Sequence, residues 1–141
     1  WINRAPVEQV EALAARTRNP SPIALVYIAG PYTGEDAWQT ERNVRRAEEL
    51  AYEVEALGAC AVCPHSNTRY VDKRTPYERK IQTTLEMMRR CDAVLFTDDW
   101  QRSTGARGEH EEAVRLGMPC FESLAGLQGW LSARGKRGGG A

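Results

Sequence analysis

The alternation of short, continuously apolar runs with longer segments of helical periodicity constrains the fold more than any other feature of the sequence. An apolar run of about four to eight residues between turn residues is typical of a strand buried on both faces, as in a parallel sheet. Strands that alternate with helices imply right-handed crossovers. We therefore expect a Rossmann-like or flavodoxin-like α/β domain, with a parallel sheet of four or five strands flanked by helices. The predicted strands are 23–29, 59–63, 93–97 and 118–121, and the predicted helices are 43–57, 77–90, 106–116 and 124–131.

The length of 141 residues fits one domain with a real core. Residues 1–22 are expected to form a leading helix over 7–16, followed by a proline-containing linker. Residues 23–131 form the predicted α/β domain. The glycine-rich and basic segment 132–141 is expected to be a disordered tail.

The charge balance argues against polymeric nucleic acid and membranes as partners. Lysine plus arginine and aspartate plus glutamate number 19 each, so the chain carries no bulk field that would attract a polyanion. The sequence has no run of about 18 apolar residues and no signal-peptide pattern at its amino end. We therefore expect a cytoplasmic protein that holds any anionic ligand through local groups. Both a monomer and a homo-oligomer remain open.

The four cysteines are interpreted as small buried hydrophobic residues. Cys60 and Cys63 have the CxxC spacing, but no second CxxC follows, and all four cysteines lie in or beside apolar runs. A lone short motif has a high false-positive rate. We therefore expect no metal site.

The segment from Trp100 to Glu109 joins a predicted strand end to a predicted helix start, where open α/β sheets bind ligands. Glu109 could be a nucleophile, or a helix-start glutamate that offsets the helix dipole. Ser103, with Gly105 and Ala106 after it, could hold a phosphate at the helix amino end or simply cap the helix. The local sequence leaves both alternatives open.

Other strand ends carry further candidates. Gly30 and Pro31 follow the first strand and could let a ligand approach the backbone, but the GxGxxG and GK[ST] patterns are absent, so no NAD or ATP cofactor is expected. His65 and Asn67 follow the second strand and could face the crevice or stabilise their loop. Asp98 follows the third strand and could protonate a leaving group or be a solvated loop acid.

Four segments together resemble the nucleoside 2-deoxyribosyltransferase-like superfamily. They are VYIAGP at 26–31, PHSN at 64–67, CDAV at 91–94 and STGARGEHEEA at 103–113. Each segment alone is a weak signal, but their order and their positions at successive strand ends are more specific. The resemblance covers about residues 24–122.

The resemblance implies roles for three residues and no cofactor. Glu109 matches the nucleophilic glutamate that attacks the anomeric carbon of a nucleoside or nucleotide and releases the base. Ser103 matches a serine that holds the 5′-phosphate in the nucleotide N-hydrolase branch, and Tyr27 matches a tyrosine that positions the nucleophile or the sugar. The implied substrate is therefore a nucleoside monophosphate. The remaining substrate-binding candidates are Gly30, Pro31, His65, Asn67, Gly105 and Ala106.

The chain departs from the family pattern at Thr84, where the superfamily usually has an aspartate eight residues before the position of Asp92. Threonine cannot replace an acid. Glu86 lies about 200° further around the helix and should not face the crevice, which leaves Asp98 as the substitute acid. Two hypotheses follow: cleavage of an N-glycosidic bond by hydrolysis or deoxyribosyl transfer, or a non-catalytic nucleotide-binding or regulatory module.

Overall fold

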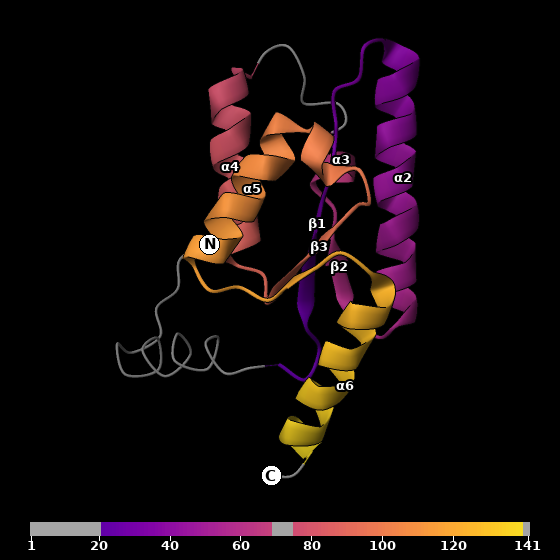
Figure 1. The fold of residues 1–141 in the computed structure, drawn as a ribbon, viewed down its shortest axis with the longest axis vertical. Helices are drawn as coiled ribbons and strands as arrows, with labels where there is room; N and C mark the ends of the chain where they lie inside the picture. The colour runs from indigo at the N-terminus through magenta and orange to yellow at the C-terminus, as the bar shows by residue number, and fades with distance from the viewer. Residues whose placement is uncertain (1–20, 69–74, 140–141) are drawn as a thin grey trace, which may run out of the picture.

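The computed structural model describes residues 21–68 and 75–139, and the predicted leading helix over 7–16 lies outside this part (Figure 1). A parallel four-stranded sheet with the strand order β2-β1-β3-β4 forms its centre. This confirms the predicted α/β fold, and the order is the flavodoxin-like one of the two alternatives. The strands are β1 (Leu25–Ala29), β2 (Cys60–Val62), β3 (Ala93–Phe96) and β4 (Cys120–Phe121).

Helices cover both faces of the sheet. Helices α2 and α6 pack on one face, whereas α4 and α5 pack on the other (Figure 1). No helix in the described part of the chain is both long and apolar enough to cross a membrane. The helices are α2 (Ala37–Ala56), α3 (Pro64–Asn67), α4 (Tyr77–Arg89), the 3-10 turn η1 (Trp100–Arg102), α5 (Thr104–Arg115) and α6 (Leu124–Gly139).

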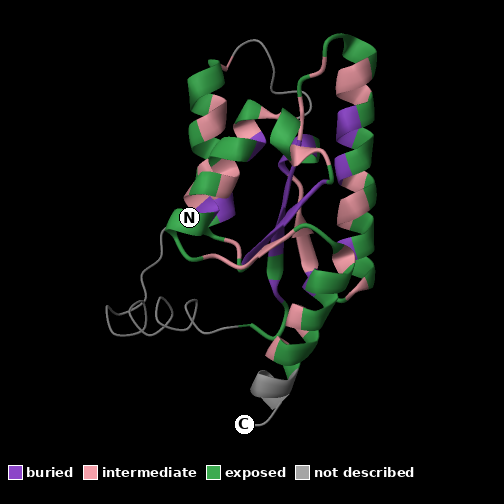
Figure 2. Cartoon of the chain, viewed as in Figure 1, coloured by how far each residue is buried: buried purple, intermediate pink, exposed green. Residues whose placement is uncertain are grey.

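The core consists of two layers because successive side chains of a strand point to opposite faces. Val26 and Ile28 of β1 pack toward α2 and α6, whereas Tyr27 and Ala29 pack toward α4 and α5. All four are completely buried, and Figure 2 shows the central strands as the main buried element. A continuous apolar run is therefore required here, as the sequence indicated.

Helix α2 begins six residues before the predicted start at position 43. Asp36 caps it, since its carboxylate accepts the backbone N–H of Gln39 at 2.7 Å. The first turns lie largely in solvent, and Trp38 is 66% exposed. They therefore lack the buried apolar stripe on which the prediction depended.

The prediction of a disordered tail over 132–141 does not hold for residues 132–139, because α6 continues to Gly139, and residues 140–141 lie outside the described part. Arg134 explains part of the extension. Its guanidinium donates to the backbone carbonyls of Ser21 and Pro22, lies 3.8 Å from an oxygen of Asp92, and packs over the ring of Trp130. These contacts join α6 to the segment before β1, and composition alone gave no sign of them.

The strand order creates a switch point between β1 and β3. The chain leaves β1 for α2 on one face and leaves β3 for α5 on the other, so the two connections diverge at the carboxyl ends of these strands. Ligands of open α/β sheets bind in such a crevice. The backbones also approach closely here, since a Cβ on Gly30 would lie 2.5 Å from the Oγ1 atom of Thr97.

We predict that Gly30→Ala lowers the free energy of unfolding by about 1 to 3 kcal/mol, because overpacking forces the buried Thr97 to move. Chemical denaturation measures the change. Adding Thr97→Ala should recover part of the loss. As a matched control, Gly108→Ala in α5 meets no atom within 4 Å and should stabilise the protein by up to about 1 kcal/mol. Equal effects at the two glycines would contradict the packing argument.

Candidate active site

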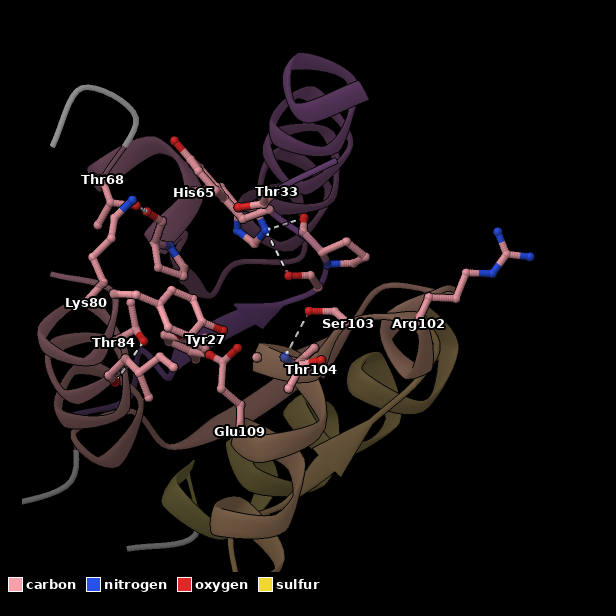
Figure 3. A pocket seen from close by; sticks show the side chains of 18 residues that line it. Tyr27, Thr33, His65, Thr68, Lys80, Thr84, Arg102, Ser103, Thr104 and Glu109 are labelled. Atoms are coloured by element: carbon pink, nitrogen blue, oxygen red, sulfur yellow. Dashed lines mark hydrogen bonds between the residues drawn. The ribbon is translucent and has the colours of Figure 1, made fainter. Parts of the chain in front are cut away.

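A pocket of about 500 Å³ lies at the switch point (Figure 3). Its wall comes from β1, the loop after β1, α3, α4 and the first turns of α5. The structure brings most of the predicted site residues together in this wall, namely Tyr27, Gly30, Pro31, His65, Ser103, Gly105, Ala106 and Glu109.

Glu109 extends into the pocket from the second turn of α5. Its Oε2 atom is buried and makes no hydrogen bond, and burial raises the pKa of Glu109 from 4.5 to about 7, while the Tyr27 hydroxyl acts in the opposite direction. A glutamate that offsets a helix dipole would lie in the first turn and have a lowered pKa. The geometry therefore does not support the dipole alternative left open by the sequence.

Tyr27 lies directly beside Glu109. Figure 3 shows its hydroxyl pointing toward the carboxylate, and the hydroxyl is buried without a hydrogen bond of standard geometry. Burial raises the pKa of Tyr27 well above its usual value, and the negative charge of Glu109 adds to the effect. The phenol thus remains protonated and can donate to the carboxylate or to a ligand. Thr84 lines the same pocket, and its hydroxyl donates to the carbonyl of Ile81 at 3.1 Å.

Ser103 caps α5, since its Oγ atom accepts the backbone N–H of Ala106 at 3.1 Å. The hydroxyl hydrogen can still be donated to a ligand, because a serine is both donor and acceptor. The amides of Thr104 and Gly105 belong to the first turn, where the helix supplies no acceptor and the dipole favours an anion. Capping and anion binding are therefore compatible at Ser103.

His65 fixes the loop after β1. Its Nε2 atom lies 3.1 Å from the carbonyl oxygen of Gly30 and 2.9 Å from that of Pro31, so Nε2 carries the proton that both acceptors share. The Nδ1 atom is buried without a partner, and burial lowers the pKa of His65. The ring is therefore neutral near pH 7. His65 therefore lines the pocket and also stabilises the loop after β1, so the two positions that the sequence left open, facing the crevice and stabilising a loop, are compatible.

Two predicted site residues lie elsewhere. Asp98 does not line the pocket, because it pairs with Arg46 of α2, and its side chain is 72% exposed. The prediction that it replaces the missing acid is wrong. Asn67 is exposed and lies beside a separate shallow depression at β2. Glu86 pairs with Arg89 and Arg90 outside the pocket, as its angular position on the helix indicated.

Sequence reasoning missed Lys80 and Tyr32, which both line the pocket. The Nζ atom of Lys80 lies 4.9 Å from the centroid of the Tyr32 ring. A signal for Lys80 was present, since it lies four residues before Thr84 and therefore on the same face of the helix. Tyr32 follows Gly30 and Pro31 directly.

Within the described residues no group of three or more histidine, cysteine, aspartate or glutamate side chains could hold a metal ion. All four cysteines are free and half-buried. Cys91 and Cys120 pack against the core beneath α4 and α5, and burial raises the pKa of the Cys91 thiol to about 12. Burial also raises the pKa of the Cys120 thiol, so both thiols remain protonated near pH 7 and pack as small hydrophobic side chains.

The family model described as Domain of unknown function (DUF4406) matches residues 24–122. The chain belongs to this family. No curated protein sequence matches this DUF4406 chain. Among solved structures, this chain is similar to that of a 2-deoxyribosyltransferase from the psychrotolerant bacterium Bacillus psychrosaccharolyticus, with 22% sequence identity and a TM-score of 0.51. The match covers 70% of this chain and 71% of the other. The similarity confirms a nucleoside 2-deoxyribosyltransferase-like fold.

The raised pKa of Glu109 predicts a pH-dependent stability difference. In the folded protein the Glu109 carboxyl keeps its proton up to about pH 7, whereas in the unfolded chain it loses the proton near its ordinary pKa of 4.5. The resulting stabilisation of the folded state is complete below pH 4.5 and is lost as the pH rises through 7. Between pH 4.5 and pH 8 the wild type should lose at most about 3 kcal/mol relative to Glu109→Gln. Urea unfolding of both proteins across this range measures the difference. Both proteins contain His65, so any pH dependence that it adds to their stability is the same and cancels from the difference.

Glu112→Gln on the same helix is the matched control. Arg115 and Arg89 lower the pKa of Glu112 to about 2, and Glu112→Gln keeps Glu109, so this variant should lose stability between pH 4.5 and pH 8 in parallel with the wild type. Parallel stability curves for wild type and Glu109→Gln would contradict the burial argument.

Proposed function

We propose that this chain cleaves the N-glycosidic bond of a nucleoside 5′-monophosphate, with Glu109 as the nucleophile. The observation that carries the proposal is the buried, unpaired Oε2 atom of Glu109 beside the unpaired Tyr27 hydroxyl. Leaving such groups without partners costs about 1 to 3 kcal/mol each. An orphaned carboxylate with a perturbed pKa in a pocket is typical of a functional site.

In the proposed first step a Glu109 oxygen forms a bond to the anomeric carbon while the bond from that carbon to the base nitrogen breaks. The electron pair of the broken bond leaves with the base. The transition state is oxocarbenium-like and positively charged at the sugar, so an adjacent carboxylate stabilises it. In this step Tyr27 would orient the carboxylate by donating its hydroxyl, which has no partner of standard geometry in the structure. The product of this step is a glycosyl ester on Glu109.

In the second step an acceptor attacks the anomeric carbon and restores the Glu109 carboxylate. Water as acceptor gives hydrolysis to a sugar phosphate, and a second base gives deoxyribosyl transfer. The similarity to a 2-deoxyribosyltransferase supports transfer at the level of the fold. Incubating the wild type with ribo- and deoxyribonucleoside monophosphates, with and without a free base, separates hydrolysis from transfer by chromatography of the released base and sugar.

The phosphate of the substrate is assigned to the amino end of α5. The Ser103 hydroxyl and the amides of Thr104 and Gly105 offer donors there, and the positive end of the helix dipole adds to them. Ser103 and Glu109 lie on the same helix and face the same pocket (Figure 3). A 5′-phosphate at this end therefore leaves the sugar near the Glu109 carboxylate.

One observation favours a second candidate, a non-catalytic nucleotide-binding module. Thr84 stands where the superfamily usually has an acid, and its hydroxyl already donates to the carbonyl of Ile81. Glu109 is the only carboxylate among the described residues that line the pocket. Nucleotide binding without any released base in the incubation above would favour this candidate over the enzyme.

We predict that Glu109→Gln abolishes release of the base while nucleotide affinity stays within about tenfold of wild type, because the change removes the nucleophile but keeps its shape. Chromatography measures base release, and calorimetry measures affinity. Unchanged turnover in Glu109→Gln would exclude Glu109 as the nucleophile.

We predict that Ser103→Ala weakens binding of a nucleoside monophosphate by about 1 to 3 kcal/mol and leaves the free nucleoside nearly unaffected. Titration with both ligands measures the difference. Ser123→Ala is the matched control: Ser123 accepts the N–H of Gly126 at 3.1 Å, before α6 and outside the pocket. Both variants lose a cap of about 1 kcal/mol, but only Ser103→Ala should lose affinity. Equal losses for both ligands would show that Ser103 is only a cap.

A further inference from the structure

Lys80 contributes a positive charge to the α4 side of the pocket. It is half-buried, and its Nζ atom lies over the ring of Tyr32 at 4.9 Å from the centroid. No carboxylate of the described residues forms an ion pair with Lys80. An ammonium that packs over an aromatic ring without a carboxylate partner remains available to a ligand.

The position of Lys80 matches the end of the pocket that would receive the base. Figure 3 shows Lys80 and Ser103 on opposite sides of Glu109. If the phosphate lies at Ser103 and the anomeric carbon lies at Glu109, the base must extend toward α4. Lys80 and the ring of Tyr32 line that end.

We propose that Lys80 is the general acid that protonates the departing base, an inference that rests on the proposed function. The ammonium supplies the proton that the superfamily acid would give from the position of Thr84. Lys80 lies one helical turn before Thr84 on the same face of α4, and its long side chain reaches the pocket from there. The substrate base must therefore carry an acceptor atom that faces α4.

The proton balance closes without any further reactant. As the glycosidic bond breaks, its electron pair goes to the base, the base takes a proton from the Lys80 ammonium, and Glu109 forms the glycosyl ester. The resulting neutral amine then removes a proton from the attacking water. The second step thus restores both the ammonium and the Glu109 carboxylate, which is the exchange of acid and base roles that retaining glycosidases use.

Other groups of the described pocket fit this role less well. The Tyr27 phenol holds its proton tightly because of burial and the adjacent Glu109. The Nε2 proton of His65 is already shared by two carbonyl oxygens. Arg102 lines the rim, but Figure 3 shows its guanidinium pointing away from the cavity.

The experiment compares two leaving groups attached to the same sugar phosphate. One substrate is the nucleoside monophosphate that the wild type cleaves. The other is the 4-nitrophenyl glycoside of the same sugar phosphate, whose leaving group departs as a stable anion and needs no proton. Lys80→Met should lower kcat/KM for the nucleotide by about 10²- to 10⁴-fold, and should lower it for the nitrophenyl substrate by less than about tenfold. Lys80→Arg should resemble Lys80→Met, because a guanidinium keeps its proton.

Arg79→Met is the matched control, since Arg79 is an exposed cation of α4 outside the pocket, and it should keep wild-type rates on both substrates. Thermal melts establish that every variant is folded, and Lys80→Gln gives a second neutral variant. Equal losses on both substrates, no loss at all, or full activity of Lys80→Arg would each overturn the role of Lys80. If the wild type releases base from no nucleoside monophosphate and does not cleave the nitrophenyl substrate, the proposed function itself is overturned instead.

Discussion

The close approach of β1 to β3 is the constraint on which the site depends. Gly30 at the end of β1 lies against Thr97 at the end of β3, and the Thr97 N–H donates to the carbonyl of Ala29 at 2.9 Å. From the sequence we expected Gly30 to let a ligand approach the backbone, but the group that occupies the space of the missing Cβ is the Thr97 side chain. This contact brings the loop of Pro31 and the start of α5 to one edge, and the pocket lies between them.

The sequence predicted the sheet well because burial on both faces demands continuous apolar runs. Those runs located all four strands to within a few residues. It predicted helix ends less well, because the first turns of α2 and the last turns of α6 have little apolar periodicity. Their ends depend on particular polar contacts, the Asp36 cap and the bonds from Arg134 to Ser21 and Pro22.

Site residues at strand ends could be predicted because the residues that follow parallel strands lie at the same edge of the sheet. Gly30, His65 and Ser103 meet in the pocket for this reason, whereas Tyr27 lies within β1 and was expected at the site only from the family resemblance. Asp98 was assigned wrongly because its partner, Arg46, comes from a helix 52 positions away, and no local pattern reveals such a pair. Lys80 was missed because a lysine on an amphipathic helix usually lies in solvent, and only the packed structure shows it over Tyr32.

The neutral imidazole of His65 also gives the pocket a chemical character of its own. Its Nε2–H is shared by the carbonyl oxygens of Gly30 and Pro31 and so fixes this wall of the pocket. Facing it, the first turn of α5 presents N–H and O–H groups. Among the described residues of this lining Glu109 is the only carboxylate, whereas Lys80 and Arg102 both carry cationic donors. An anionic ligand is therefore matched to this lining, whereas a cationic ligand would have only the Glu109 carboxylate to pair with among the described residues.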